Sequence, residues 1–140
     1  MLGLWVLLGT VAVALVAGAV LRAVNGRIRH GRSPAAELPE PVRELIDGGA
    51  DVTLVQLSTT FCAPCRHARA VYGRLAERTD GVRHVELDVT SRPEVATALG
   101  VYRTPTTLAV DARGTELARI TGVPKLDELH DALAPHLVRG

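Results

Sequence analysis

The sequence has few cysteines, few aromatic residues and almost no lysine. Two cysteines among 140 residues are too few for the disulfide framework of a small secreted domain, and they indicate a local site instead. Aromatic residues make up 3% of the chain and hydrophobic residues 47%. The core must therefore consist mainly of Val, Leu, Ile and Ala, which suit buried parallel strands covered by helices. Only one of the 16 Lys and Arg residues is a lysine, a balance that hints at a bacterial coding sequence.

An excess of positive charge is absent from most of the chain. The net charge is +1, but Arg22, Arg27, Arg29 and Arg32 lie close together with no acidic residue among them. From residue 33 onward acidic residues outnumber basic ones. A domain that binds nucleic acid should carry a basic stripe on its folded part, so nucleic acid is not an expected partner.

An uncharged apolar segment opens the chain. Residues 2–21 contain no charged side chain, and as a helix these residues would span about 30 Å, the thickness of a bilayer core. We predict one transmembrane helix over residues 1–24. A cleaved signal peptide is the competing interpretation, because Ala17-Gly18-Ala19 resembles a small-residue cleavage site, but no Lys or Arg precedes the apolar run.

The arginines that follow this segment predict its orientation. Positive charge beside a membrane span favours the cytoplasmic side, so we expect a single-pass protein of the cell membrane with its domain in the cytoplasm. An extracytoplasmic domain is the alternative. Residues 25–38 are interpreted as a basic juxtamembrane segment and linker, and residues 39–140 as one domain. The linker itself is expected over residues 33–39.

Hydrophobic periodicity predicts alternating helices and strands in that domain. Strict alternation over residues 82–89 indicates a half-buried strand, and Asp111-Ala112-Arg113-Gly114 is a turn sequence between two strands. The pattern predicts an α/β domain with a mixed four-stranded sheet flanked by helices. The expected helices are 41–46, 62–78, 93–99 and 125–137, and the expected strands are 52–58, 82–89, 106–110 and 116–120.

The two cysteines lie at the start of a predicted helix, directly after a predicted strand. Partial positive charge and free N–H groups at a helix N-terminus lower a thiol pKa, and the thiolate is the reactive form. Cys65 lies one turn after Cys62, within disulfide reach, and Pro64 holds the two in a fixed relation. Cys62 can therefore attack a partner disulfide, and Cys65 can resolve the mixed disulfide.

Two other roles for the cysteines fit the sequence less well. A metal site needs four ligands, and His67 is the one further candidate nearby. A purely structural disulfide across three residues closes too short a loop to stabilise a fold much. We therefore expect no metal at this site.

The segment Phe61-Cys62-Ala63-Pro64-Cys65 is similar to the Trp-Cys-Gly-Pro-Cys motif of the thioredoxin family. Further similarities are Leu87-Asp88, Gly100-Val101-Tyr102-Arg103-Thr104-Pro105-Thr106, which corresponds to the segment with the family's cis-proline, and Gly122 before the last helix. Across about residues 39–140 the chain thus resembles the thioredoxin family.

The resemblance implies a thioredoxin fold and a thiol-disulfide oxidoreductase. Cys62 would be the exposed nucleophile and Cys65 the resolving thiol. Pro105 would be a cis residue packed against them, and the backbone of Thr104 would pair with the substrate. Phe61, Ala63 and Pro64 would complete the substrate-binding surface. The resemblance also implies disulfide-containing proteins as substrates, a thioredoxin reductase or another dithiol protein as electron donor, and no cofactor beyond the disulfide.

Besides Phe61 and Ala63, which replace the tryptophan and the glycine of the motif, the chain departs from the family pattern at three places. Gln56 stands where the family usually has a buried acid that helps to deprotonate the resolving thiol, and His84 aligns with a lysine often found near that acid. One hypothesis is that His84 replaces the acid as proton shuttle, and the competing interpretation is a solvated strand histidine. The first strand of the full fold is expected to be missing, with the linker and membrane segment in its place.

A reductase on the cytoplasmic face of the membrane is the leading functional prediction, because that compartment is reducing. One alternative is an outward-facing oxidoreductase for exported proteins. Another is a non-catalytic binding module that uses the surface around Pro105, with the cysteines as a redox switch. A third is a metallochaperone, which predicts stoichiometric binding of Cu(I) or Zn(II) by the reduced domain.

Overall fold

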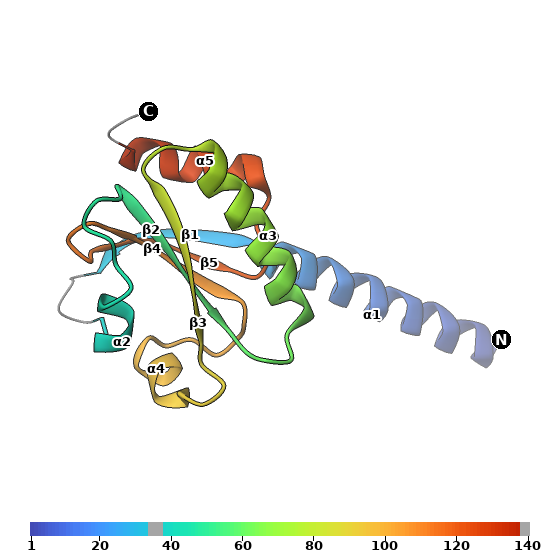
Figure 1. Cartoon of the computed structure of the whole chain (residues 1–140). Coiled ribbons are helices and arrows are strands. Elements are labelled where there is room, and N and C mark those ends of the chain that lie inside the picture. The colour runs from blue at the N-terminus through green and yellow to red at the C-terminus, as the bar shows by residue number, and fades with distance from the viewer. Residues whose placement is uncertain (34–37, 138–140) are drawn as a thin grey trace.

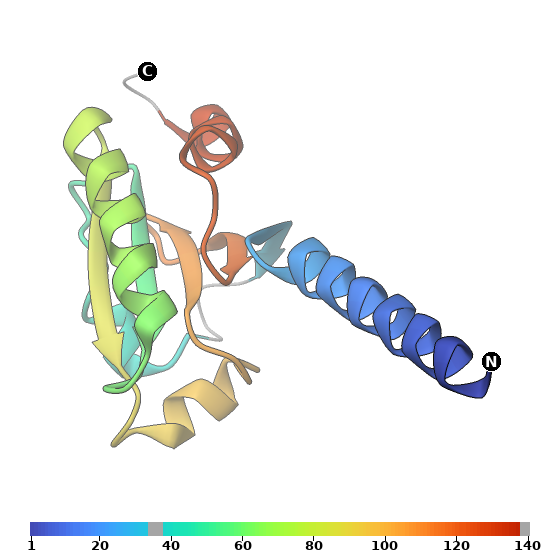
Figure 2. The same ribbon diagram turned by 90° about the vertical axis from the view of Figure 1, so that its right-hand side faces the viewer.

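A computed structural model describes residues 1–33 and 38–137, which form one sheet with helices on both faces and a long helix leading away from it (Figures 1 and 2). The helices are α1 (Leu2–Val24), α2 (Glu40–Arg43), α3 (Ala63–Arg78), α4 (Pro93–Ala98) and α5 (Leu126–Leu133), followed by the 3₁₀ turn η2 (Ala134–His136). The strands are β1 (Arg27–Ser33), β2 (Val52–Ser58), β3 (Val82–Asp88), β4 (Thr106–Asp111) and β5 (Glu116–Thr121).

The sheet is mixed and has the strand order β1-β5-β4-β2-β3. Strand β2 pairs with β3 in parallel and with β4 antiparallel, and β4 and β5 form the predicted hairpin. All seven residues of β2 are buried, as expected for a strand covered on both faces. The predicted mixed α/β architecture is confirmed.

The predicted number of four strands is wrong, because residues assigned to the juxtamembrane segment form a fifth. Arg27 to His30 pair antiparallel with β5. In this strand Ile28 packs against the core while Arg27 and Arg29 are exposed, which is the alternation of a half-buried strand. Arginines on an edge strand also discourage pairing with other chains. The predicted linker over residues 33–39 falls largely on residues 34–37, which lie outside the described residues.

Two apolar cores cover the two faces of the sheet. Alternate residues of β2 divide between them: Leu54 packs with Tyr72 of α3, whereas Val55 and Leu57 pack on the side of α2 and α4. Gln56 is two residues from Leu54 and therefore belongs to the face covered by α3. The sheet thus places a buried amide beneath the helix that carries both cysteines.

The closing helix is shorter than the predicted residues 125–137. It ends at Leu133, and a 3₁₀ turn follows over Ala134–His136. Pro135 lies in that turn. Because proline lacks an N–H and clashes with the preceding turn of an α-helix, the chain tightens there rather than extending α5.

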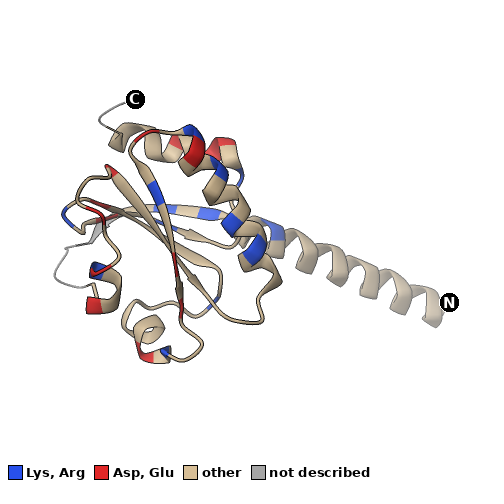
Figure 3. Ribbon diagram, in the orientation of Figure 1, with Lys and Arg blue, Asp and Glu red and all other residues tan. Residues whose placement is uncertain are grey.

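Helix α1 has no buried residue. It has 23 residues and a mean hydropathy of 2.5, so its length and composition allow it to cross a membrane. A signal sequence near the N-terminus would meet the same criteria. Arg22 in its last turn is its one charged side chain (Figure 3).

Two glycines lie against each other where α1 meets the sheet. Gly26 has φ 74° and Gly122 has φ 81°, and a Cβ on Gly26 would lie 2.6 Å from the carbonyl oxygen of Val123. The Gly26 N–H donates to the Thr121 carbonyl at 2.7 Å. The junction is therefore closely packed through backbone atoms.

Gly26→Ala is expected to lower the free energy of unfolding by about 1–3 kcal/mol, because it adds both left-handed strain and a steric clash. Chemical denaturation of the full chain in detergent measures this loss. Gly31→Ala in the strand β1 that follows is the matched control, since no atom lies within 4 Å of its added Cβ. Equal stability of the two variants would contradict the packed junction.

Candidate active site

Cys62 and Cys65 form a disulfide across the first turn of α3, with their Cα atoms 5.2 Å apart. Cys62 is the N-cap residue with an extended backbone, and Pro64 occupies the first turn of the helix. Proline is favoured there because its missing N–H has no helical partner in the first turn. The strand β2 and the start of α3 therefore position the disulfide at the carboxyl end of the parallel strands, as ligand sites of open α/β sheets usually are.

The two sulfur atoms differ in exposure and in hydrogen bonding. Cys65 is 1% exposed, whereas Cys62 is half-buried. The Sγ of Cys62 accepts hydrogen bonds from the Cys65 N–H at 3.2 Å and from the Thr104 hydroxyl at 3.8 Å. These donors and the N-terminus of α3 would stabilise a thiolate on Cys62.

The loop before β4 forms the second half of the site. The Thr104–Pro105 peptide bond is cis, as the resemblance implies, and the Thr104 hydroxyl lies 3.4 Å from that of Thr59. Pro105 is buried. Residues 42 positions apart in sequence are thus brought together at the disulfide.

Exposed residues surround the disulfide. Phe61 is 98% exposed, and Ala63 and Pro64 are also exposed. Tyr102, which sequence reasoning did not single out, is 87% exposed on the loop that ends at the cis-proline. Its position three residues before Pro105 was the signal that could have found it. Phe61, next to the disulfide, and Tyr102, on the cis-proline loop, each offer exposed apolar contact area to a protein partner.

A short acidic turn holds the segment before Cys62. Asp88 at the end of β3 accepts hydrogen bonds from the backbone N–H of Thr90 at 2.8 Å and from the hydroxyl of Thr60 at 3.3 Å. The hydrogen bonds from Thr90 and Thr60 hold the pKa of the Asp88 carboxyl below its usual value. The carboxylate thereby ties the β2–α3 turn to the neighbouring strand.

Gln56 is fully buried beneath Cys65 and uses its whole amide group. Its Nε2 donates to the Cys65 carbonyl at 2.8 Å and to the Ser58 hydroxyl at 3.2 Å. Its Oε1 lies 2.9 Å from Nε2 of His84. Because this oxygen only accepts, Nε2 of His84 must carry the proton. The structure therefore connects His84 to the backbone of Cys65 through Gln56.

His84 is half-buried and held in place, unlike the solvated strand histidine of the competing interpretation. Its ring stacks on Tyr72 with centroids 5.5 Å apart. Burial lowers the pKa of His84; the neighbouring Glu86 opposes this and Arg69 adds to it. Arg69 and Glu86 form two hydrogen bonds of 2.6 Å with each other. Burial thus disfavours the charged form of His84, and its ring is held between Tyr72 and Gln56.

The lowered pKa of His84 predicts a pH dependence of stability. Below the ordinary imidazole pKa of about 6.5 the unfolded chain binds a proton that the folded chain resists, so stability falls with falling pH until the folded pKa is passed. His84→Gln, which can still donate to Gln56, is expected to show a weaker decline between pH 7.5 and 5.5. Denaturation midpoints at both pH values measure this difference. A decline in the variant as large as in the wild type would contradict the prediction.

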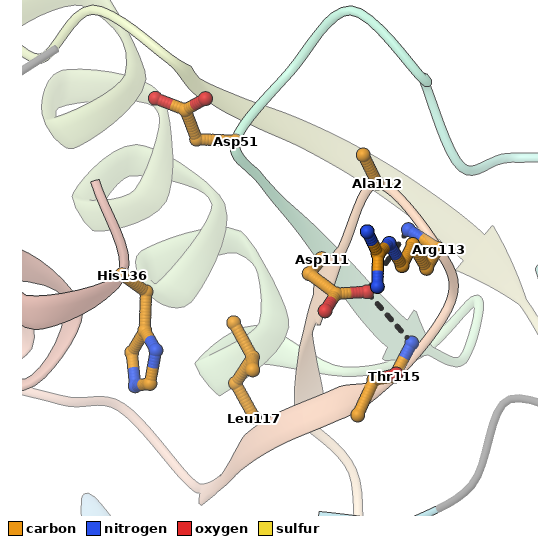
Figure 4. A pocket seen from close by; sticks show the side chains of 7 residues that line it. All are labelled: Asp51, Asp111, Ala112, Arg113, Thr115, Leu117 and His136. Carbon is orange, nitrogen blue, oxygen red and sulfur yellow. Dashed lines mark hydrogen bonds between the residues drawn. The ribbon is translucent and has the colours of Figure 1, made fainter. Parts of the chain in front are cut away.

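A pocket of about 450 Å³ lies at the opposite end of the sheet, beside the tip of the β4–β5 hairpin (Figure 4). It is lined by Asp51, Asp111, Ala112, Arg113, Thr115, Leu117 and His136. None of these lining residues carries a thiol. The carboxylate of Asp111 accepts a hydrogen bond from the backbone N–H of Thr115 at 2.9 Å. The redox chemistry belongs to the disulfide rather than to this pocket.

Comparison with known proteins identifies the family. The thioredoxin family model matches residues 39–135. Thioredoxin H2 of Arabidopsis thaliana is 38% identical over 76 residues, which are 54% of this chain and 56% of that protein. The chain thus spans little more than half the length of that relative.

Two further comparisons cover more of the related chains. Thioredoxin Asp f 28 of Aspergillus fumigatus is 30% identical over 102 residues, 71% of this chain and 93% of that protein. The solved structure of a mutant thioredoxin from Halobacterium salinarum has a TM-score of 0.60 at 23% identity, covering 71% of this chain and 86% of that one. The fold, the Cys62–Cys65 pair and these matches together show that the chain belongs to the thioredoxin family.

Proposed function

We propose that this chain is a membrane-tethered thiol-disulfide oxidoreductase that reduces protein disulfides. The observation that carries the proposal is the disulfide at the start of α3, in which Cys62 is accessible and Cys65 is buried. The disulfide is itself the redox group, so the reaction needs no further cofactor. A thioredoxin reductase or another dithiol protein would restore the dithiol.

In the proposed reaction, the thiolate of Cys62 attacks one sulfur of the substrate disulfide. A bond forms between Cys62 and that sulfur, the substrate bond breaks, and the leaving thiolate takes up a proton. The Cys65 thiolate then attacks Cys62, which forms the Cys62–Cys65 disulfide and releases the second substrate thiol. Two electrons pass from the protein to the substrate. Phe61, Ala63, Pro64 and the Thr104–Pro105 backbone form the contact surface.

Gln56, which does not titrate, lies beneath Cys65, so this position offers no carboxylate to receive the proton of the resolving thiol. His84 is the titratable member of the hydrogen-bonded chain that ends at the Cys65 carbonyl, so we propose that it handles this proton. His84→Ala is then expected to shift the pH profile of the reduction rate. An unchanged profile would end the proton-shuttle hypothesis and leave His84 a structural role.

We further propose that α1 spans the cell membrane and that the domain faces the cytoplasm, as the arginines after the apolar segment favour. A membrane-impermeant thiol reagent applied to intact cells tests the orientation. Protection of the reduced cysteines from the reagent is expected. Labelling from outside would instead favour an oxidoreductase that acts on exported proteins.

Reduction of insulin by the full chain in detergent, with dithiothreitol as reductant, tests the activity. The wild-type protein is expected to accelerate the reduction well above the rate with dithiothreitol alone. Absence of any acceleration would favour the binding-module alternative, to which Gln56 in place of an acid gives some support.

A further inference from the structure

Helix α1 joins the sheet at the same end of the strands as the disulfide. Arg27 at the start of β1 pairs with Thr121, and Thr121 pairs with Thr106 at the start of β4. Gly122 N–H donates to the carbonyl of Pro105 at 2.8 Å. One strand therefore separates the end of the helix from the cis-proline loop, a distance of about 10 Å at two strand spacings.

The connection between helix and sheet is short and well packed. Two residues, Asn25 and Gly26, separate α1 from β1. The side-chain oxygen of Asn25 accepts a hydrogen bond from the Val123 N–H at 3.3 Å, and the Asn25 N–H continues the helix to Leu21 at 3.0 Å. A flexible linker would let the domain turn freely above a membrane, whereas this junction limits its orientation.

Helix α1 leads away from the domain at this end of the sheet. Figures 1 and 2 show α1 leaving the sheet from the start of β1, and Figure 1 shows the hairpin tip between β4 and β5 at the far end of the sheet. If the apolar span ends at Leu21, about one helical turn, or roughly 5 Å, separates it from Asn25. The end of the sheet with the disulfide then lies at the headgroup layer, and the β4–β5 hairpin points away from the bilayer.

The surface between the end of α1 and the loop before Pro105 suits that position. A pocket of about 260 Å³ on this surface is lined by Val24, Arg27, Arg29, Tyr102, Arg103 and neighbouring residues. Arg27, Arg29 and Arg103 are exposed and make no ion pair within the described residues. Arginines near a bilayer surface are attracted by anionic headgroups, and the amphipathic ring of Tyr102 is typical of the interfacial layer.

We propose that the substrates are disulfides held close to the bilayer surface on membrane proteins, on the side where the domain lies. This inference rests on the proposed function and on α1 spanning the membrane. A disulfide near the surface meets Cys62 without any rearrangement of the junction. A disulfide on a domain far above the surface lies beyond the reach of the tethered site.

Vesicles that contain the full chain and one of two single-span peptides test this inference. Both peptides carry the same small disulfide loop, one at the bilayer surface and one about 37 Å above it on a helical extension of 25 residues. The protein is reduced beforehand and used in excess. In a single turnover the loop gains two electrons and two protons, and Cys62 and Cys65 become the disulfide.

The surface disulfide is expected to be reduced at least about tenfold faster than the distal one, because both partners are confined in reach of each other. A 45-residue Gly-Ser spacer between Val24 and Asn25 adds a flexible reach of about 37 Å, which matches the height of the distal loop, and is expected to bring the two rates within about twofold. The same spacer between Ala112 and Arg113 at the hairpin tip is the matched control and should keep the wild-type preference.

Two kinds of failure are distinguishable. Equal rates for the two peptides with the wild-type protein, or faster reduction of the distal one, would overturn the inference while leaving the oxidoreductase activity in place. Absence of reduction of both peptides and of insulin would instead overturn the proposed function, and the inference with it. Insulin reduction by the spacer variants in detergent confirms that both are folded and active.

Discussion

Cys62→Ser is expected to abolish disulfide reduction, whereas Cys65→Ser is expected to keep the first step and stop there. The reason is the division of roles between an accessible sulfur and a buried one: Cys65 is 1% exposed and reaches only the sulfur of Cys62. Without Cys65 the mixed disulfide on Cys62 has no intramolecular thiol to resolve it. Turnover of insulin should fall to the uncatalysed rate in both variants, and Cys65→Ser should accumulate about one adduct per chain.

Non-reducing electrophoresis and intact-mass measurement detect the adduct, and in cells they would give the mass of the trapped partner. His67→Ala is the matched control, because His67 is exposed on the same helix two residues after Cys65, and it should keep wild-type turnover. A stable adduct on Cys65 in the Cys62→Ser variant would reverse the assigned roles.

The fold was largely predictable because its strands and helices have clear periodicities. The apolar run of β2 and the turn sequence at Asp111–Gly114 each predict the element found there. Strand β1 was not predicted, since among the described side chains of its arginine-rich sequence Ile28 alone packs against the core. The same arginines fit a membrane flank, and the pairing with β5 that decides between the two is a tertiary contact.

Some residues of the site were predictable from the sequence, whereas one contact between them was not. Cys62, Cys65 and Pro105 follow from the motif and from the resemblance. The contact between Gln56 and His84 depends on the lateral register of β2 and β3, which pair Gln56 with Glu86 rather than with His84. A sequence pattern gives the faces of each strand but not which residues meet diagonally across two strands.

Gln56→Leu is expected to lower the free energy of unfolding of the oxidised protein by about 2–4 kcal/mol. Leucine fills a similar volume but leaves the Cys65 carbonyl and the ring nitrogen of His84 without their partner, and each buried group left unpaired costs about 1–3 kcal/mol. The Ser58 hydroxyl loses its donor as well. Guanidinium denaturation of the full chain in detergent measures the loss.

Thr53→Val in the same strand is the matched control for Gln56→Leu. Thr53 is as buried as Gln56, but its hydroxyl has no hydrogen-bond partner in the part of the chain that the structure describes. Its replacement by valine removes an unpaired polar atom at nearly constant volume, so stability should change by less than about 0.5 kcal/mol or rise. Equal losses in the two variants would show that burial on β2, rather than the bonds of the amide, sets the cost. A loss confined to Gln56→Leu would establish that this amide holds the backbone of Cys65 where the family usually places an acid.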